Sequence, residues 1–164
     1  MKIYSAKKMP SQGFGLWDEN GTLLGEIVYP KWYSVTPEIK LNNNVYKVER
    51  KSVWKLDIEV SENNKALLIF TMNWKGEIEV DDLLNLKKYT LCKEKWYGNT
   101  YQLKNSYQEQ LLILEPEVNF KSFMFGYKIK ALKEEGSSLL EILSMVYALH
   151  YFTVMNDVSA TTLV

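Results

Sequence analysis

The chain has 164 residues, of which 46% are hydrophobic and 24% charged. This length and this balance are typical of one folded domain and exclude an intrinsically disordered chain. The 20 lysine and arginine residues equal the 20 aspartate and glutamate residues, so the basic excess of nucleic-acid-binding domains is missing and nucleic acid is not an expected partner.

Short β-type runs follow one another from about residue 2 to about residue 131. Turn residues separate them about every eight to twelve positions, a spacing typical of an antiparallel sandwich or barrel. In the first hairpin, within residues 14–29, the turn ends in an Asn-Gly pair that supplies the positive φ angles of a tight return. Similar turn sequences occur at residues 42–44, 62–64, 73–76 and 98–99. Short connections of this kind predict a meander in which consecutive strands pair antiparallel.

The last two runs, residues 110–114 and 119–131, complete the strand region. In the second run, apolar residues fall on both faces near the centre. This pattern predicts either a strand between two layers or a strand of a barrel that is filled from within.

The residue pattern changes from that of strands to that of a helix after Gly136. Ser138 is placed to cap a helix, and Glu141, three residues later, completes a capping box. A helix is therefore predicted from about residue 138 to about residue 155, at the end of a single domain that spans residues 1–164. Apart from a narrow arc that holds Glu141, Ser144 and Ala148, nearly every residue around this helix is large and apolar.

Such a helix has to be enclosed by protein or by lipid. As a membrane span it would be short, it would contain Glu141 and His150, and no lysine or arginine follows it. Enclosure by the β-strands is therefore the favoured interpretation, and insertion of the helix into a membrane is the alternative. A lipocalin-like carrier, with its helix outside the barrel, would need a broader polar face than this helix has.

Residues that could carry catalysis are scarce. A hydrolase would need His150, the only histidine, to meet Cys92 or a serine, and the sequence has no Gly-x-Ser-x-Gly elbow. A neutral, hydrogen-bonded core histidine and a small buried cysteine are the simpler interpretations. We therefore predict no catalytic residue.

The acidic residues Glu77, Glu79 and Asp81 share one face of a predicted strand, next to Asp82. Carboxylates in this arrangement could bind Ca²⁺ or Mg²⁺, but the solvated face of an edge strand is the favoured interpretation. With one cysteine and one histidine, a zinc site is not expected either, and neither a metal nor another cofactor is predicted.

One cationic cluster stands out as a candidate ligand-binding site. Its residues are Lys47, Arg50, Lys51, Trp54 and Lys55. The lysines and the single arginine could attract an anionic phospholipid headgroup, and the indole of Trp54 is suited to a membrane interface. Solvated strand edges are the alternative explanation for the same residues.

Several segments together resemble the LURP-one-related and Tubby C-terminal-like group, which includes the phospholipid scramblases. They are residues 87–91, the hairpin around 98–99, the strand at 120–123 and the terminal residues 136–143. The resemblance implies a mainly β fold, a closed antiparallel barrel of about twelve strands that encloses one hydrophobic C-terminal helix. Members of the group often carry an acidic residue just before this helix and another near its end, where this chain has Ser137-Ser138 and His150-Tyr151.

We therefore expect a non-catalytic binding or scaffold module that recognises anionic phospholipid or a protein partner through the barrel surface, with peripheral membrane contact. The alternatives are a membrane-active protein that inserts its C-terminal helix, and a small hydrolase that uses Cys92 or a serine with His150. The single cysteine and the absence of a signal-peptide pattern near residues 1–10 predict a cytoplasmic location.

Overall fold

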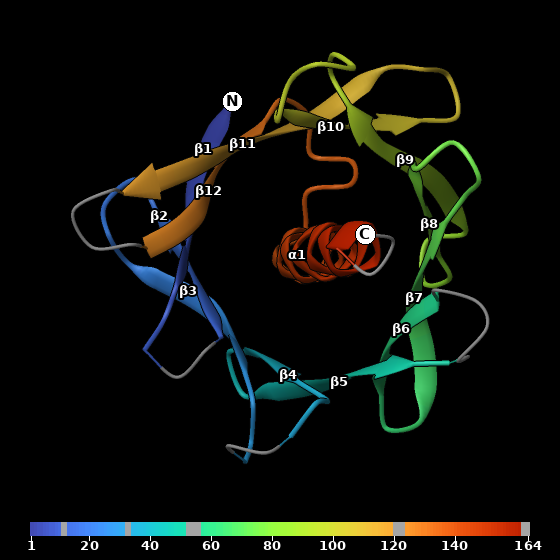
Figure 1. Cartoon of the computed structure of the whole chain (residues 1–164). Helices are drawn as coiled ribbons and strands as arrows, with labels where there is room; N and C mark the ends of the chain where they lie inside the picture. Colours follow the sequence, from blue (N-terminus) through green and yellow to red (C-terminus); the bar gives the residue numbers. More distant parts are fainter. Residues whose placement is uncertain (11–12, 32–33, 52–56, 120–123, 162–164) are drawn as a thin grey trace.

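The computed structural model describes residues 1–161 except for the stretches 11–12, 32–33, 52–56 and 120–123, and it describes only the backbone of residues 119, 124 and 154–161. Twelve antiparallel strands form a closed barrel, and one helix lies along its axis (Figure 1). The strands are β1 (Lys2–Lys8), β2 (Phe14–Asp18), β3 (Leu23–Val28), β4 (Glu38–Leu41), β5 (Asn44–Arg50), β6 (Asp57–Glu62), β7 (Lys65–Met72), β8 (Ile78–Asp82), β9 (Lys87–Lys93), β10 (Tyr101–Asn105), β11 (Gln110–Asn119) and β12 (Met124–Ala131).

Each strand pairs with its neighbours in the sequence, and β1 pairs with β12 to close the barrel. At this seam Lys2 lies opposite Ala131, and Lys7 lies opposite Gly126. The predicted meander is therefore confirmed, with the difference that residue 119 ends β11 instead of starting β12. The interpretation of β8 as an edge strand is wrong, because a closed barrel leaves β8 paired on both sides.

Local turn chemistry accounts for the first hairpin. One carboxylate oxygen of Asp18 accepts hydrogen bonds from the backbone N–H groups of Asn20 and Thr22, at 2.9 and 2.8 Å. Gly21 has a φ of 79°, a value that a residue with a side chain rarely adopts. These contacts return the chain from β2 to β3 where the sequence predicts the turn.

The inward-facing side chains of the strands are apolar, as the period-two pattern requires. On β9, for example, Tyr89 and Leu91 are buried, whereas Thr90 and Cys92 between and after them are only half-buried. The inward residues of all strands pack into one continuous core with the helix.

The helix, α1 (Leu139–Thr161), begins where the capping box predicts and ends later than predicted. The Ser138 hydroxyl accepts a hydrogen bond from the Glu141 N–H at 3.2 Å, and the Glu141 carboxylate accepts one from the Ser138 N–H at 2.9 Å. Every residue from 141 to 149 is buried. The predicted enclosure of the helix by the strands is confirmed.

The helix passes close to β3 because Gly25 has no side chain. A Cβ atom at this position would lie 2.3 Å from Cδ2 of Leu41 and 2.9 Å from Cδ1 of Leu143. Both distances are too short for real carbon contacts. The barrel interior is therefore filled by side chains up to the backbone of its wall.

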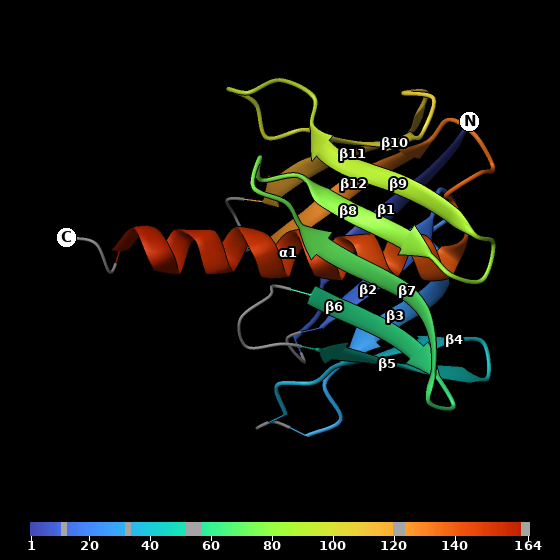
Figure 2. The same cartoon turned by 90° about the vertical axis from the view of Figure 1, so that its right-hand side faces the viewer.

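The course of α1 distinguishes the two ends of the barrel. We call the end at which α1 begins the helix-start end, and the opposite end the helix-exit end; Figure 2 shows α1 extending beyond the barrel at the helix-exit end. Because successive connections of a meander alternate between the ends, residues 73–77 and 94–100 lie at the helix-exit end, and residues 83–86 and 106–109 lie at the helix-start end. In the part of the chain described, no helix is long and apolar enough to cross a membrane.

Candidate functional site

The described members of the predicted cationic cluster, Lys47, Arg50 and Lys51, differ in their contacts. Arg50, at the helix-exit end of β5, places its guanidinium 5.6 Å from the ring centroid of Tyr151 on α1, and it donates a hydrogen bond to the Tyr151 hydroxyl at 3.4 Å. Lys51 forms an ion pair with Glu59 at 3.2 Å, and Lys47 is exposed on β5. The only arginine of the chain thus contacts the emerging helix.

Two residues of the predicted cluster, Trp54 and Lys55, lie outside the described residues. The described members that remain, Lys47, Arg50 and Lys51, are surface residues at or near the helix-exit end of β5. They share this end of the barrel with a second group of residues, which we did not predict.

This second group, which we call the exit rim, consists of aromatic and lysine side chains on two neighbouring loops. Trp74 and Lys75 lie between β7 and β8, and Lys95, Trp96 and Tyr97 lie between β9 and β10. Trp74 is 90% exposed, Trp96 is 88% exposed and Tyr97 is 69% exposed. A single exposed ring needs no explanation, but several at one end of a protein indicate an interaction surface.

Each loop of the exit rim pairs a cation with an aromatic ring. The Lys75 ammonium lies 5.5 Å from the ring centroid of Trp74, and the Lys95 ammonium lies 5.9 Å from that of Tyr97. The rings of Trp96 and Tyr97 meet edge to face at 5.4 Å. In the sequence, these residues could have been recognised as aromatic residues beside lysine within a turn, where a ring is not expected to be buried.

Cys92 and His150, the pair of one hydrolase alternative, do not lie together. His150 is half-buried inside the barrel, with its ring 5.2 Å from that of Phe14. Cys92 lies on the outer face of β9, alternating with the inward-facing Leu91. The barrel wall separates the thiol from the imidazole.

Burial favours the uncharged forms of both the His150 imidazole and the Cys92 thiol. Burial, and then the nearby Lys8, lower the pKa of His150 below its usual value, so the imidazole is neutral at pH 7. Burial also raises the pKa of the Cys92 thiol, which makes it a poorer nucleophile. The neutral core histidine predicted from the sequence agrees with this environment.

The acidic face of β8 is engaged with its neighbours. The Asn73 side chain donates to Glu77 at 3.2 Å and to Glu79 at 3.4 Å, and Asp81 lies 3.7 Å from the Lys88 ammonium. Among the described residues, no group of three or more histidine, cysteine or acidic side chains is arranged to hold a metal ion.

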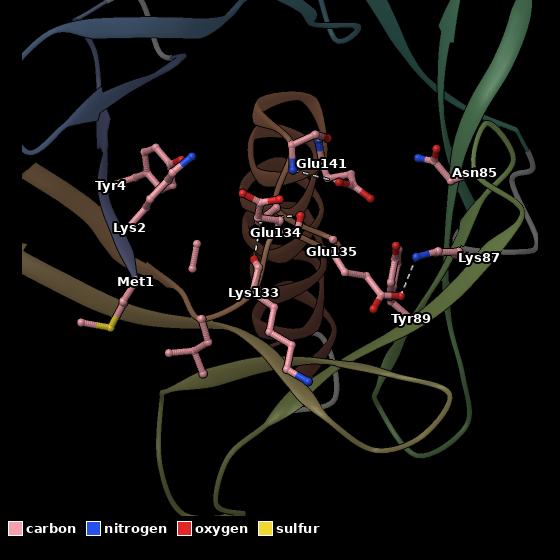
Figure 3. A pocket seen from close by; sticks show the side chains of 15 residues that line it. Met1, Lys2, Tyr4, Asn85, Lys87, Tyr89, Lys133, Glu134, Glu135 and Glu141 are labelled. Atoms are coloured by element: carbon pink, nitrogen blue, oxygen red, sulfur yellow. Dashed lines mark hydrogen bonds and ion pairs between the residues drawn. The ribbon is translucent and has the colours of Figure 1, made fainter.

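A cavity of about 670 Å³ opens at the helix-start end. Figure 3 looks into it along α1, with Lys2 and Tyr4 of β1 on one side and Asn85, Lys87 and Tyr89 on the other. The connection from β12 to α1 crosses between these walls. We call this space the helix-start cavity.

Glu141 lines this cavity from the first turn of α1. It is only 7% exposed. Its Oε2 caps the helix through Ser138, but its Oε1 is buried and has no hydrogen-bond donor among the described residues. A buried carboxylate oxygen without a donor is costly, because water no longer solvates it.

A second carboxylate lies against Glu141 from the barrel wall. Asp82, at the end of β8, is 2% exposed, and its oxygens accept hydrogen bonds from the N–H groups of Leu84 and Asn85, both at 3.0 Å, and from the Asn85 amide at 2.7 Å. These three hydrogen bonds hold the Asp82 carboxyl group in place. Burial, and then the charge and contact of Asp82, raise the pKa of Glu141 against the lowering effect of Ser138.

Tyr89 completes this polar corner. Its pKa is raised by burial and by the charges of Glu141, Asp82 and Glu135. The phenol therefore stays protonated, with a hydroxyl that can donate or accept a hydrogen bond. Glu141 was predicted only as a capping residue, and its contact with Asp82 could not be inferred because the two residues belong to different elements.

Comparison with models of protein families, with curated proteins and with solved structures finds no match. Membership of the LURP-one-related and Tubby C-terminal-like group stays a prediction.

Proposed function

We propose that this domain is a non-catalytic binding module that attaches peripherally to anionic phospholipid membranes through its helix-exit end. The observation that carries the proposal is the exit rim, where the exposed indoles of Trp74 and Trp96 stand beside Lys75 and Lys95. Indole rings partition to the interface between water and lipid, and lysines are attracted to anionic headgroups.

The position of the exit rim supports a role at a surface. The interior of the barrel is filled by α1, so the strands enclose no ligand chamber where the core packs. Arg50 and Lys51 add positive charge at the same end of the barrel. These two cations and the exit rim thus lie at one end of the barrel.

The residues that we assign to lipid binding differ from those predicted from the sequence. Arg50 is held by Tyr151, and Lys51 is paired with Glu59, so neither is fully available to a headgroup. The lysines of the exit rim form no ion pair among the described residues. We therefore assign most of the charge contribution to Lys75 and Lys95.

Vesicle flotation tests this proposal. The protein is expected to float with vesicles of phosphatidylcholine and phosphatidylserine and to stay behind with pure phosphatidylcholine. Each lysine near an anionic surface contributes about 1 kcal/mol, so Lys75→Gln with Lys95→Gln is expected to weaken binding about thirtyfold. The double variant Trp74→Ala with Trp96→Ala is expected to weaken vesicle binding more than the double lysine variant does.

Tyr107 provides a matched control, because it is 86% exposed and lies at the helix-start end. Tyr107→Ala should leave flotation unchanged. Equal flotation with neutral and anionic vesicles, or an equal loss in the Tyr107 and tryptophan variants, would contradict the proposal. Flotation of the exit-rim variants at wild-type levels would also contradict it, because another face of the barrel would then bind the lipid.

A further inference from the structure

The first turn of α1 holds a carboxyl oxygen that the membrane proposal does not use. Glu141 is 7% exposed, and its Oε2 accepts the capping hydrogen bond from the Ser138 N–H at 2.9 Å. Its Oε1 is buried and has no hydrogen-bond donor among the described residues. A buried carboxylate oxygen that neither a donor nor water reaches is costly, so this atom needs a hydrogen from another source.

The group that contacts Glu141 from the barrel wall is a second carboxyl, that of Asp82, which is 2% exposed. Asp82 Oδ1 accepts hydrogen bonds from the N–H groups of Leu84 and Asn85, and Oδ2 accepts one from the Asn85 amide. Because each carboxylate oxygen has two lone pairs, Oδ2 keeps one acceptor site. Two acceptors in contact form a hydrogen bond only when a proton lies between them.

The lysines near Glu141 do not replace this proton. The Lys87 ammonium lies 3.0 Å from Glu135, and the Lys133 ammonium lies 2.9 Å from Glu109. Among the ion pairs of the described residues, none includes Glu141. The charge of Glu141 is therefore not compensated by a cation.

The remaining titratable groups also leave Oε1 without a donor. Tyr89 on β9 faces Glu141, and its phenol stays uncharged because burial, and then the charge of Glu141, raise its pKa. Further along the same cavity lie the Met1 amino group, Lys2, Tyr4 and Glu134. In the described part of the chain, none of these groups donates a hydrogen bond to Glu141 Oε1.

We propose that Glu141 and Asp82 share one proton in the folded protein, and that this proton joins the first turn of α1 to the end of β8. The proton supplies the hydrogen that Oε1 lacks and removes the repulsion between two charged carboxylates. The pKa of Glu141 is raised accordingly, first by burial and then by Asp82, against the lowering effect of Ser138. This inference does not depend on the membrane proposal.

Loss of the proton is expected to open this contact. Once both carboxyl groups are charged, Glu141 either leaves Asp82 or stays buried with an uncompensated charge. The helix-start cavity borders Glu141 (Figure 3), so a rotation of the side chain brings its carboxylate to water. The same rotation removes the cap from the Ser138 N–H. The start of α1 is thus a pH-sensitive device, closed by the proton and opened as pH rises.

A titration of side-chain carboxyl carbons by nuclear magnetic resonance tests the shared proton. The midpoint of Glu141 is expected to lie above the range of ordinary glutamates. It should fall in Asp82→Asn, because the neighbouring charge is removed and the asparagine amide can donate to Oε1. Glu134→Gln removes an exposed charge from the same cavity and should leave the midpoint unchanged. An ordinary midpoint in the wild type, or an unchanged midpoint in a folded Asp82→Asn variant, would overturn the proposal.

Hydrogen exchange tests the opening without a change at Asp82. Glu141→Gln should keep the contact closed at every pH, because the glutamine carbonyl accepts from the Ser138 N–H and its amide donates to Asp82. At pH 9 the amides of Ser138 and Ile142 are expected to exchange about tenfold faster in the wild type than in Glu141→Gln, and at pH 5 equally. Comparison at one pH removes the intrinsic pH dependence of exchange.

The opening is expected to be local. In the wild type at pH 9, residues 146–149 should keep their protection, because they are buried inside the barrel. Glu134→Gln should exchange like the wild type. Equal exchange of Ser138 and Ile142 in the wild type and Glu141→Gln at pH 9 would overturn the proposal. Loss of protection throughout α1 would also overturn it, because the proton would then stabilise the whole fold and not the start of the helix.

Discussion

At the scale of single residues, the most unusual feature is the contact between two buried carboxyl groups, Asp82 and Glu141. Asp82 has three hydrogen-bond donors, whereas Glu141 Oε1 has none among the described residues. Two ionised carboxylates in contact repel each other, so this contact favours a protonated Glu141. The contact joins the first turn of α1 to the end of β8.

This contact predicts that the folded protein loses stability as pH rises. The pKa of Glu141 is higher in the folded state than in the unfolded chain, so the folded state binds the proton more tightly. The stabilisation is complete below the unfolded-state pKa and is lost as pH rises through the raised folded-state pKa. Urea unfolding measured from pH 4 to pH 9 is expected to show this decline.

Glu141→Gln should remove much of the decline and raise the free energy of unfolding at pH 8 by about 1 to 3 kcal/mol, because it removes a buried, unsatisfied charge. Glu134→Gln is the matched control, since Glu134 is exposed in the adjacent connection. If both variants follow the wild-type pH curve, the carboxyl contact does not contribute to stability.

At the scale of elements, the packing of α1 against β3 is the tightest constraint. The helix core residue Leu143 reaches the backbone of Gly25, where an added Cβ would overlap it at 2.9 Å and overlap Leu41 at 2.3 Å. Overpacking of this kind typically costs about 1 to 3 kcal/mol. Only glycine fits at position 25, because a Cβ atom there would overlap Leu41 and Leu143.

Gly25→Ala is therefore expected to lower the free energy of unfolding by about 1 to 3 kcal/mol in chemical denaturation. Gly98→Ala is the control, because a Cβ there would meet its nearest atom at 3.7 Å, an ordinary contact. Adding Leu143→Ala to Gly25→Ala should cost less than Leu143→Ala costs in the wild-type background. If the losses in the free energy of unfolding from the two substitutions are strictly additive, Leu143 and position 25 do not interact.

The start of α1 was predictable because it depends on Ser138 and Glu141, which are three residues apart. Its end was not, because no glycine or proline stops the helix near residue 155 and the chain continues helical to Thr161. Enclosure was predictable from the apolar residues around the helix. The contact of Arg50 with Tyr151 was not, since it depends on how β5 is placed around α1.

At the scale of the whole molecule, barrel closure separates two sets of loops. The turn sequences predicted the meander, whereas the position of residues 73–76 and 98–99 at one end of the barrel was not predicted. No local sequence pattern indicates that β1 pairs with β12. Without knowledge of this closure, β8 was interpreted as an edge strand, although it pairs with β7 and β9. The helix-start cavity also depends on closure, because β1, β9 and the connection to α1 line it together.

Hydrogen exchange tests whether the molecule stays closed on a membrane. With anionic vesicles, amides of residues 141–149 should keep their protection, because these residues are buried in the barrel. Loops 73–77 and 94–100 should exchange more slowly than in buffer, since they contact lipid. Loss of protection in residues 141–149 would support the alternative in which α1 leaves the barrel and inserts.

The helix that fills the barrel follows all twelve strands in the sequence. During synthesis all twelve strands leave the ribosome before the segment that covers their inner faces, so the barrel lacks its core until residues 139–152 emerge. The β1–β12 pair, between the first and last strands, must form around that late segment, and pairings so distant in sequence form slowly. A chain that stops short of α1 would expose apolar strands with nothing to cover them, which makes it a substrate for chaperones and proteases rather than a smaller working barrel.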